Sequence, residues 1–199
     1  VIDHGDSLIC PGFINLHTHL LYSNFEKLEY EGGLFPWLEK LVAEIKGKSE
    51  EDFRESVKFG IEKALSTGTI FLVENTPSEV SIEELLKSPL RSLIGLEVFG
   101  SDEEQAENIF NEAIKKLSTL NSQFPIPKSQ VVLSPHAAYD VSKALWQELI
   151  QWSKENNNPL LTHLEESPEE RLWWQEKCGA GIDFWKQINK LEPKLKYWN

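Results

Sequence analysis

Short apolar runs alternate along this chain with longer segments of helical periodicity, and this alternation limits the folds open to it more than any other feature. Between the runs, apolar residues recur at intervals of three and four, as in residues 37–45, 53–65, 145–152 and 184–191. Such alternation is typical of βαβ units and a parallel sheet. We expect five strands, namely the run that ends at His19 and residues 69–74, 93–99, 131–136 and 160–163.

Serines followed three residues later by a glutamate predict where several helices begin. In a capping box the serine oxygen accepts a backbone N–H and the acid reaches back to the first residue. The candidates are Ser81 with Glu84, Ser101 with Glu104, and Ser167 with Glu170, the last with Pro168 at the first helical position.

Two histidines one residue apart, His17 and His19, close the first apolar run. Alternate side chains of a strand point to the same face, so both imidazoles are expected to converge at the end of that strand, as a divalent cation requires. His163 closes the last run in a similar way and offers a third ligand. Glu166, three residues later, is placed to transfer protons to and from a bound water. The plainer alternatives are histidines satisfied by backbone at strand ends and a solvated acid in the first turn of a helix.

Composition narrows the class of partner. The 199 residues carry a net charge of −12, which disfavours nucleic acid and anionic membrane surfaces and favours a small-molecule substrate. No apolar run approaches a membrane span, and no signal peptide is visible at the N-terminus. Cys10 and Cys178 lack C-x-x-C spacing, so a soluble protein of the reducing cytoplasm is expected. A homo-oligomer is left open.

The chain contains no methionine and opens within a segment, at Val1, so we expect it to be a piece of a longer protein. Active groups of an eight-stranded (β/α) barrel gather at the C-terminal ends of its strands, where the histidines fall here. Such barrels typically need about 250 residues. About five of eight βα units are therefore expected in this chain.

The segments PGFINLHTHL, SPHAAYD and THLEES resemble the amidohydrolase superfamily. The resemblance is to its mononuclear-metal deaminase and chlorohydrolase branch, which includes the S-adenosylhomocysteine and aminofutalosine deaminases. It implies an α/β fold, the (β/α)8 TIM barrel of metal-dependent hydrolases, truncated here at both ends. Residues 1–8 would be the end of a β-sandwich segment entering the barrel, and residues 9–199 a partial barrel domain.

The resemblance also implies a set of roles. His17, His19 and His163 would hold one divalent ion, with zinc favoured over iron, Glu166 would be the catalytic proton shuttle, and His136 would contact substrate. The implied activity is hydrolysis of a non-peptide carbon–nitrogen bond, above all deamination of an aminopurine nucleoside or related heterocycle. The family's sixth-strand histidine and eighth-strand aspartate have no counterpart in these residues, so the isolated chain is expected to be inactive.

Three alternatives remain at this stage. A chlorohydrolase or a cyclic amidase would use the same activated water and acid. The third alternative is of a different class, an inactive fragment that serves as an interaction module.

Glu97, near the end of the third run, could be a metal ligand, as in some amidohydrolases. No run supplies the lysine that binuclear members carbamylate, so a mononuclear site is preferred.

Overall fold

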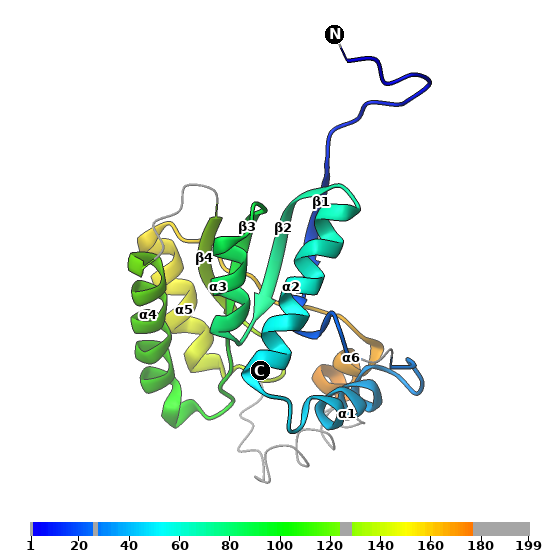
Figure 1. Cartoon of the computed structure of the whole chain (residues 1–199). Coiled ribbons are helices and arrows are strands. Elements are labelled where there is room, and N and C mark those ends of the chain that lie inside the picture. Colours follow the sequence, from blue (N-terminus) through cyan, green and yellow to red (C-terminus); the bar gives the residue numbers. More distant parts are fainter. Residues whose placement is uncertain (1, 26–27, 124–128, 177–199) are drawn as a thin grey trace.

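A parallel sheet of four strands forms the centre of the molecule in the computed structural model, which describes residues 2–25, 28–123 and 129–176 (Figure 1). The strands lie side by side in chain order and every neighbouring pair is parallel. Their carboxyl ends therefore share one edge of the sheet. The strands are β1 (Phe13–Thr18), β2 (Thr69–Thr76), β3 (Arg91–Val98) and β4 (Ser129–Pro135).

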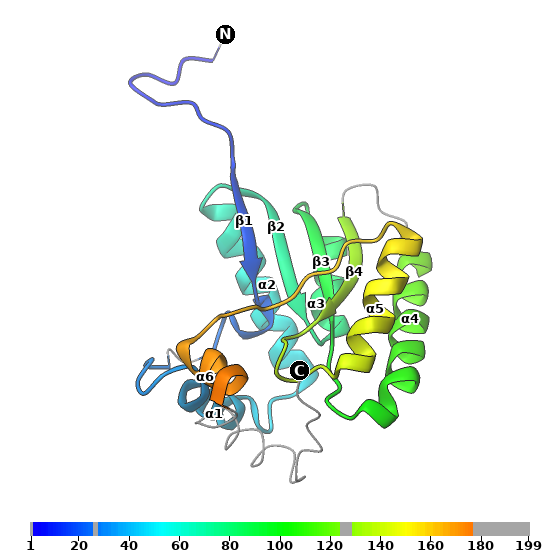
Figure 2. The ribbon, with the colours of Figure 1, turned by 180° about the vertical axis from the view of Figure 1, so that it is seen from behind.

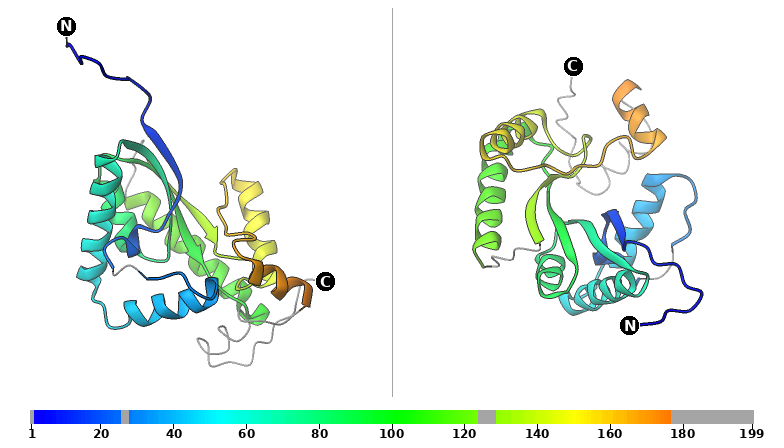
Figure 3. Two further views of the ribbon diagram at one scale, coloured as in Figure 1. Left: turned by 90° about the vertical axis from the view of Figure 1, so that its right-hand side faces the viewer. Right: turned by 90° about the horizontal axis from the view of Figure 1, so that it is seen from above.

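Helices connect successive strands, as the alternating sequence pattern predicts. The strands form an arc with α2, α3 and α4 on its outer side (Figure 3), and the segment after α5 crosses the sheet on the opposite side to reach α6 (Figure 2). None of the helices in the described ranges is long and apolar enough to cross a bilayer. The helices are α1 (Leu34–Ile45), α2 (Glu50–Ser66), α3 (Glu79–Lys87), α4 (Ala106–Gln123), α5 (Lys143–Asn156) and α6 (Pro168–Glu176), with 3₁₀ turns η1 (Leu20–Tyr22) and η2 (Glu103–Gln105).

The hydrophobic core lies between the sheet and its helices. Because β2 to β4 are covered by neighbouring elements, their sequences are nearly continuous apolar runs, as in other parallel sheets. Helix α3 contributes a fully buried face against them. The core includes Val57, Leu72, Ile82, Leu85, Ile94, Leu133, Leu145 and Leu149, none of them more than 1% exposed.

The edge strand β1 is the exception to this burial. Phe13, Ile14 and Leu16 are 63%, 63% and 71% exposed, and β1 has no strand on its outer edge within the described ranges. A closed barrel has no free edges, so this arrangement matches the expected partial barrel.

The fifth run forms single bridges instead of the expected strand. Leu160 pairs with Leu133 and His163 with Ala137, without a ladder between them. Strand β4 ends at Pro135, which has no N–H to donate, so continuous pairing is interrupted there. The bridge at Ala137 still brings His163 to the carboxyl edge of the sheet.

Two of the three predicted helix caps are wrong. Helix α3 is capped by Ser78, which accepts from the N–H of Val80, and Ser81 lies buried inside the helix. Asp102, in place of Ser101, caps η2. Ser167 is confirmed, since its oxygen accepts from the N–H of Glu170 at 3.2 Å. The predicted helix over residues 184–191 and Cys178 lie outside the described residues.

Leu161, on the segment that carries His163, packs closely over Gly95 of β3. A Cβ atom there would lie 2.9 Å from Leu161 Cδ1, 2.9 Å from Ser134 Cβ and 3.0 Å from Asn75 Oδ1. We expect Gly95→Ala to lower the free energy of unfolding by about 1–3 kcal/mol, the usual effect of overpacking. Urea denaturation of the two proteins would measure the difference. An unchanged midpoint would show that the neighbouring side chains accommodate the added methyl group without loss of stability.

Candidate active site

Three histidines converge at the carboxyl edge of the sheet: His17 at the end of β1, His19 directly after it, and His163 in the segment after α5. His19 Nε2 lies 3.1 Å from His163 Nε2. The ring centroid of His17 lies 5.0 Å from that of His19 and 5.0 Å from that of His163. One ring nitrogen of each lies within 4.8 Å of the other two, so the three can serve one metal ion.

The turn that follows His19 is fixed by a buried carboxylate at the end of β2. Both oxygens of Glu74 accept from the N–H of Leu20, at 3.1 and 3.0 Å. Burial raises the pKa of Glu74 well above its usual value, although the hydrogen bond from Leu20 opposes the shift. Glu74 is completely buried, so this anchor holds η1, and with it His19, against the sheet.

Hydrogen bonds orient two of the rings. His163 Nδ1 lies 2.9 Å from the carbonyl oxygen of His136, which can only accept, so His163 carries its proton there and leaves Nε2 with a free lone pair. His17 Nδ1 lies 3.1 Å from Asn75 Nδ2, at the buried end of β2. Histidine ligands of metals commonly donate from their second ring nitrogen, as His163 does, whereas His17 Nδ1 accepts from the Asn75 amide.

The charge state of the histidines suits a cation. Burial, with the nearby rings of His163 and His17, lowers the pKa of His19 to about 3, and burial with His136 lowers the pKa of His163. His19 is therefore neutral near pH 7 and presents a lone pair in place of a charge. Three imidazoles are a set that zinc and other transition metals bind, so the residues present fit a metal ion.

His136, predicted to contact substrate, lies beside this group. Its ring centroid is 4.8 Å from that of His163, and its Nδ1 lies 2.5 Å from Asp140 Oδ2. Burial lowers the pKa of His136, but the hydrogen bond and charge of Asp140, helped by Glu97, outweigh burial and raise it. Phe99 stacks on the other face of the ring, with centroids 4.5 Å apart.

Glu166, the predicted proton shuttle, stands at the start of α6. The hydroxyl of Tyr139 donates to Glu166 Oε1 at 2.7 Å, and the Glu166 N–H donates to Glu170 Oε2. The carboxylate belongs to neither of the groups that could hold a metal within the described ranges, but its charge helps raise the pKa of His136. Glu166 therefore lies beside the histidines without being a ligand in this arrangement.

Residues that sequence reasoning did not assign to the site complete it: Asn75, Tyr139 and Asp140. Asp140 stands four residues after His136, and this spacing was a usable signal. Asn75 offered none, because polar residues at strand ends are common, and Tyr139 stands in the segment SPHAAYD without a role of its own. Glu97 was considered only as a ligand; it reaches the site from β3, with Oε1 4.0 Å from His136 Nε2.

The burial of Glu97 predicts a pH-dependent change in stability. Burial raises its pKa to about 7, against the opposing charge of His136. The folded state then holds this proton more tightly than the unfolded state, so stability is present below about pH 4.5 and is lost as the pH rises towards 7. In zinc-free protein, Glu97→Gln should leave the free energy of unfolding unchanged at pH 4 and raise it by roughly 2–3 kcal/mol at pH 8. An equal increment at both values would contradict this.

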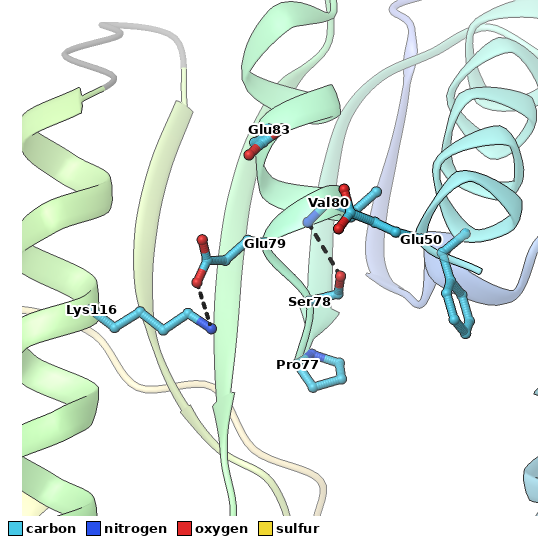
Figure 4. Close-up of a pocket in the computed structure, with 8 residues that line it drawn as sticks. Glu50, Pro77, Ser78, Glu79, Val80, Glu83 and Lys116 are labelled. Atoms are coloured by element: carbon cyan, nitrogen blue, oxygen red, sulfur yellow. Dashed lines mark hydrogen bonds and ion pairs between the residues drawn. The ribbon is translucent and has the colours of Figure 1, made fainter. Parts of the chain in front are cut away.

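A groove on the helical side of the sheet is separate from the histidines. It has a volume of about 560 Å³ and lies among α2, α3 and α4 (Figure 4). Lys116 on its wall is paired with Glu79 at 3.1 Å. No residue of the histidine group lines it, and its remaining charged residues, Glu50 and Glu83, are acidic.

Parallel βα units with a histidine cluster at the carboxyl edge of the sheet indicate part of a (β/α) barrel, a class of protein that gathers its active groups at that edge. The model of the amidohydrolase family matches residues 8–190. The chain belongs to the amidohydrolase family.

Individual relatives point to one branch. An adenosine deaminase of Helicobacter pylori is 30% identical over 193 residues, which cover 93% of this chain and 44% of the relative. The crystal structure of Helicobacter pylori aminofutalosine deaminase with methylthio-coformycin has a TM-score of 0.77 at 27% identity, covering 92% of this chain and 44% of that one. A zinc-bound adenosine deaminase of Xanthomonas campestris shares the fold, with a TM-score of 0.68 at 20% identity over 88% of this chain and 41% of that one. The chain spans under half the length of these proteins.

Proposed function

We propose that the natural protein containing this chain is a metal-dependent hydrolase that deaminates an adenosine-like nucleoside. The observation that carries the proposal is the convergence of His17, His19 and His163 at the carboxyl edge of a barrel sheet. The names of the relatives support deamination over chloride or amide hydrolysis, since they describe adenosine-type substrates.

His17, His19 and His163 would hold the ion, and zinc is the better candidate than iron because a related protein of this fold binds it. A bound ion would supply a water that is nucleophilic near pH 7, since metal binding lowers the pKa of water. The histidines would keep the ion at the mouth of the barrel, where the end of β1 meets the segment after α5.

Glu166 moves the protons. It takes one from the attacking water, passes it to a ring nitrogen of the substrate, and a further transfer lets the amino group leave as ammonia while a carbonyl forms. Tyr139 positions this carboxylate through its hydroxyl. An exposed acid on a turn would otherwise sample many rotamers.

His136 binds the substrate. Asp140 accepts a hydrogen bond from Nδ1 and favours the charged ring, so Nε2 can donate to an acceptor atom of the heterocycle. Stacking against Phe99 restrains the plane of the ring. His136 thus orients the substrate without taking part in bond making.

We further propose how the chain is divided, in which compartment the protein works and what it binds. Residues 1–8 belong to a segment that enters the barrel and residues 9–199 to the partial barrel, which is supported by the absence of helix and strand over residues 2–12. Cys10 is an exposed free thiol, which favours the reducing cytoplasm. The partner is a small molecule.

Ammonia release tests the function. The natural protein that contains these residues, loaded with zinc, should release one ammonia per adenosine-type nucleoside consumed and yield the 6-oxo product. The same protein after zinc removal is the control. Failure of the loaded protein on every aminopurine nucleoside would overturn the proposal.

A further inference from the structure

Glu97 carries a buried acceptor beside the histidines that has no hydrogen-bond donor within the described ranges. Its side chain is 4% exposed, and Oε1 is buried without a hydrogen bond. A buried carboxylate oxygen without a donor is costly, and such atoms are few in folded proteins. The fold keeps this one, so a ligand is the natural source of the missing donor.

The surroundings show which way the carboxylate points. Glu97 is the penultimate residue of β3, and Oε1 lies 4.0 Å from His136 Nε2, too far for a hydrogen bond. One ring nitrogen of His163 lies within 4.8 Å of a Glu97 oxygen. The carboxylate therefore lies beside both the proposed ligand His163 and the proposed substrate contact His136.

A role as metal ligand fits less well. Glu97, His136 and His163 do form a second group that could hold an ion, but that group shares His163 with the first. His163 Nε2 already faces His19, and its Nδ1 faces the carbonyl oxygen of His136. An ion at Glu97 would take a ligand from the three-histidine site, so the two sites exclude one another.

We propose that Glu97 determines substrate specificity, with Oε1 accepting a hydrogen bond from an N–H or O–H of the bound substrate beside His136. This inference rests on the proposed function and assigns part of its substrate pocket. His136 and Glu97 then form a donor and acceptor pair 4.0 Å apart. Such a pair selects ligands that present complementary groups and rejects analogues that lack the donor, because the buried oxygen would again be left unpaired.

An adenosine-like nucleoside carries two sources of this donor, the exocyclic amino group and the sugar hydroxyls. Both have the same hydrogen-bond chemistry, so analogues must separate them. The deoxy nucleosides 2′-deoxyadenosine and 3′-deoxyadenosine each lack one hydroxyl. In 6-methylpurine riboside a methyl group of similar size replaces the amino group.

The experiment combines these analogues with Glu97→Gln and Glu97→Ala in the zinc-loaded natural protein. kcat/KM is measured for adenosine and the deoxy nucleosides, and the inhibition constant for 6-methylpurine riboside. We expect both variants to lower kcat/KM for adenosine by about 10- to 100-fold, the usual effect of losing a hydrogen bond to a charged group. With the wild-type protein, the analogue that lacks the donor group should be weaker than adenosine by the same factor. The Glu97 variants should not weaken that analogue further. The identity of that analogue tells which group Glu97 binds.

Two controls keep the outcome specific. Glu107→Gln makes the same chemical change at an exposed position of α4 and should alter none of the four values. Zinc content is measured for every variant and should stay at one ion per chain. The inference is overturned if Glu97→Gln impairs the values for all four nucleosides by the same factor, or changes none of them. It is also overturned if this variant no longer contains zinc.

Failure of the proposed function would look different. A protein that binds the nucleosides but releases no ammonia contradicts deamination alone, and the same analogue and variant comparison can then be made with dissociation constants from calorimetry. A protein that binds none of the four nucleosides contradicts both.

Discussion

His163→Asn is expected to remove the metal ion and the hydrolytic activity of the natural protein together. His163 supplies one of the three converging imidazoles, and its Nε2 lies 3.1 Å from that of His19. Loss of an outer hydrogen-bond partner typically lowers metal affinity or activity by about 10- to 100-fold, and loss of a ligand should exceed this. Zinc per chain, measured by mass spectrometry after dialysis, should fall from one to near zero.

His4→Asn provides a matched control for this change, because His4 is exposed and lies outside the sheet. It should retain both zinc and turnover. A His163→Asn protein that keeps its zinc at wild-type affinity would show that this histidine is not a ligand, and the three-histidine site would then be wrong.

Glu166→Gln should lower kcat by about 10²- to 10⁴-fold while zinc binding stays intact, since it removes a proton acceptor and no ligand. Substrate affinity should change little. The neighbouring Glu165→Gln is the control, because Glu165 is exposed and pairs with Arg171 at 3.2 Å. If the two variants were equally active, Glu166 would be one more solvated acid at the start of α6.

Tyr139→Phe separates positioning from proton transfer. Removal of the hydroxyl leaves Glu166 chemically able to act but without its hydrogen bond of 2.7 Å. The loss in kcat should therefore be smaller than for Glu166→Gln. A larger loss would make Tyr139 itself the proton donor.

The fold was largely predictable because hydrophobic periodicity is a local property of the sequence. Strands β2, β3 and β4 lie within a few residues of their predicted runs, and α1, α2 and α5 contain the apolar residues that predicted them. The failures come from features that depend on tertiary contacts. Pro135 interrupts the pairing of the fifth run, and Ser81 is buried by the packing of α3, so neither outcome was visible locally.

The candidate site was predictable where a motif joined residues that are close in sequence, as in His17 with His19. Glu97 and Asn75 come from separate strands, and only the register of the sheet brings them to the same edge. Their partners lie 39 and 58 residues away along the chain. Sequence spacing carries no signal across such distances, so the network that surrounds the histidines required a structure.

The proposed chemistry depends on one metal ion that His17, His19 and His163 bind together. X-ray absorption at the zinc edge on the natural protein, before and after His17→Asn, tests it most directly. We predict nitrogen ligands at about 2.0–2.1 Å in the first spectrum and a smaller imidazole contribution in the second. An unchanged spectrum, or a shell dominated by sulfur, would contradict the claim.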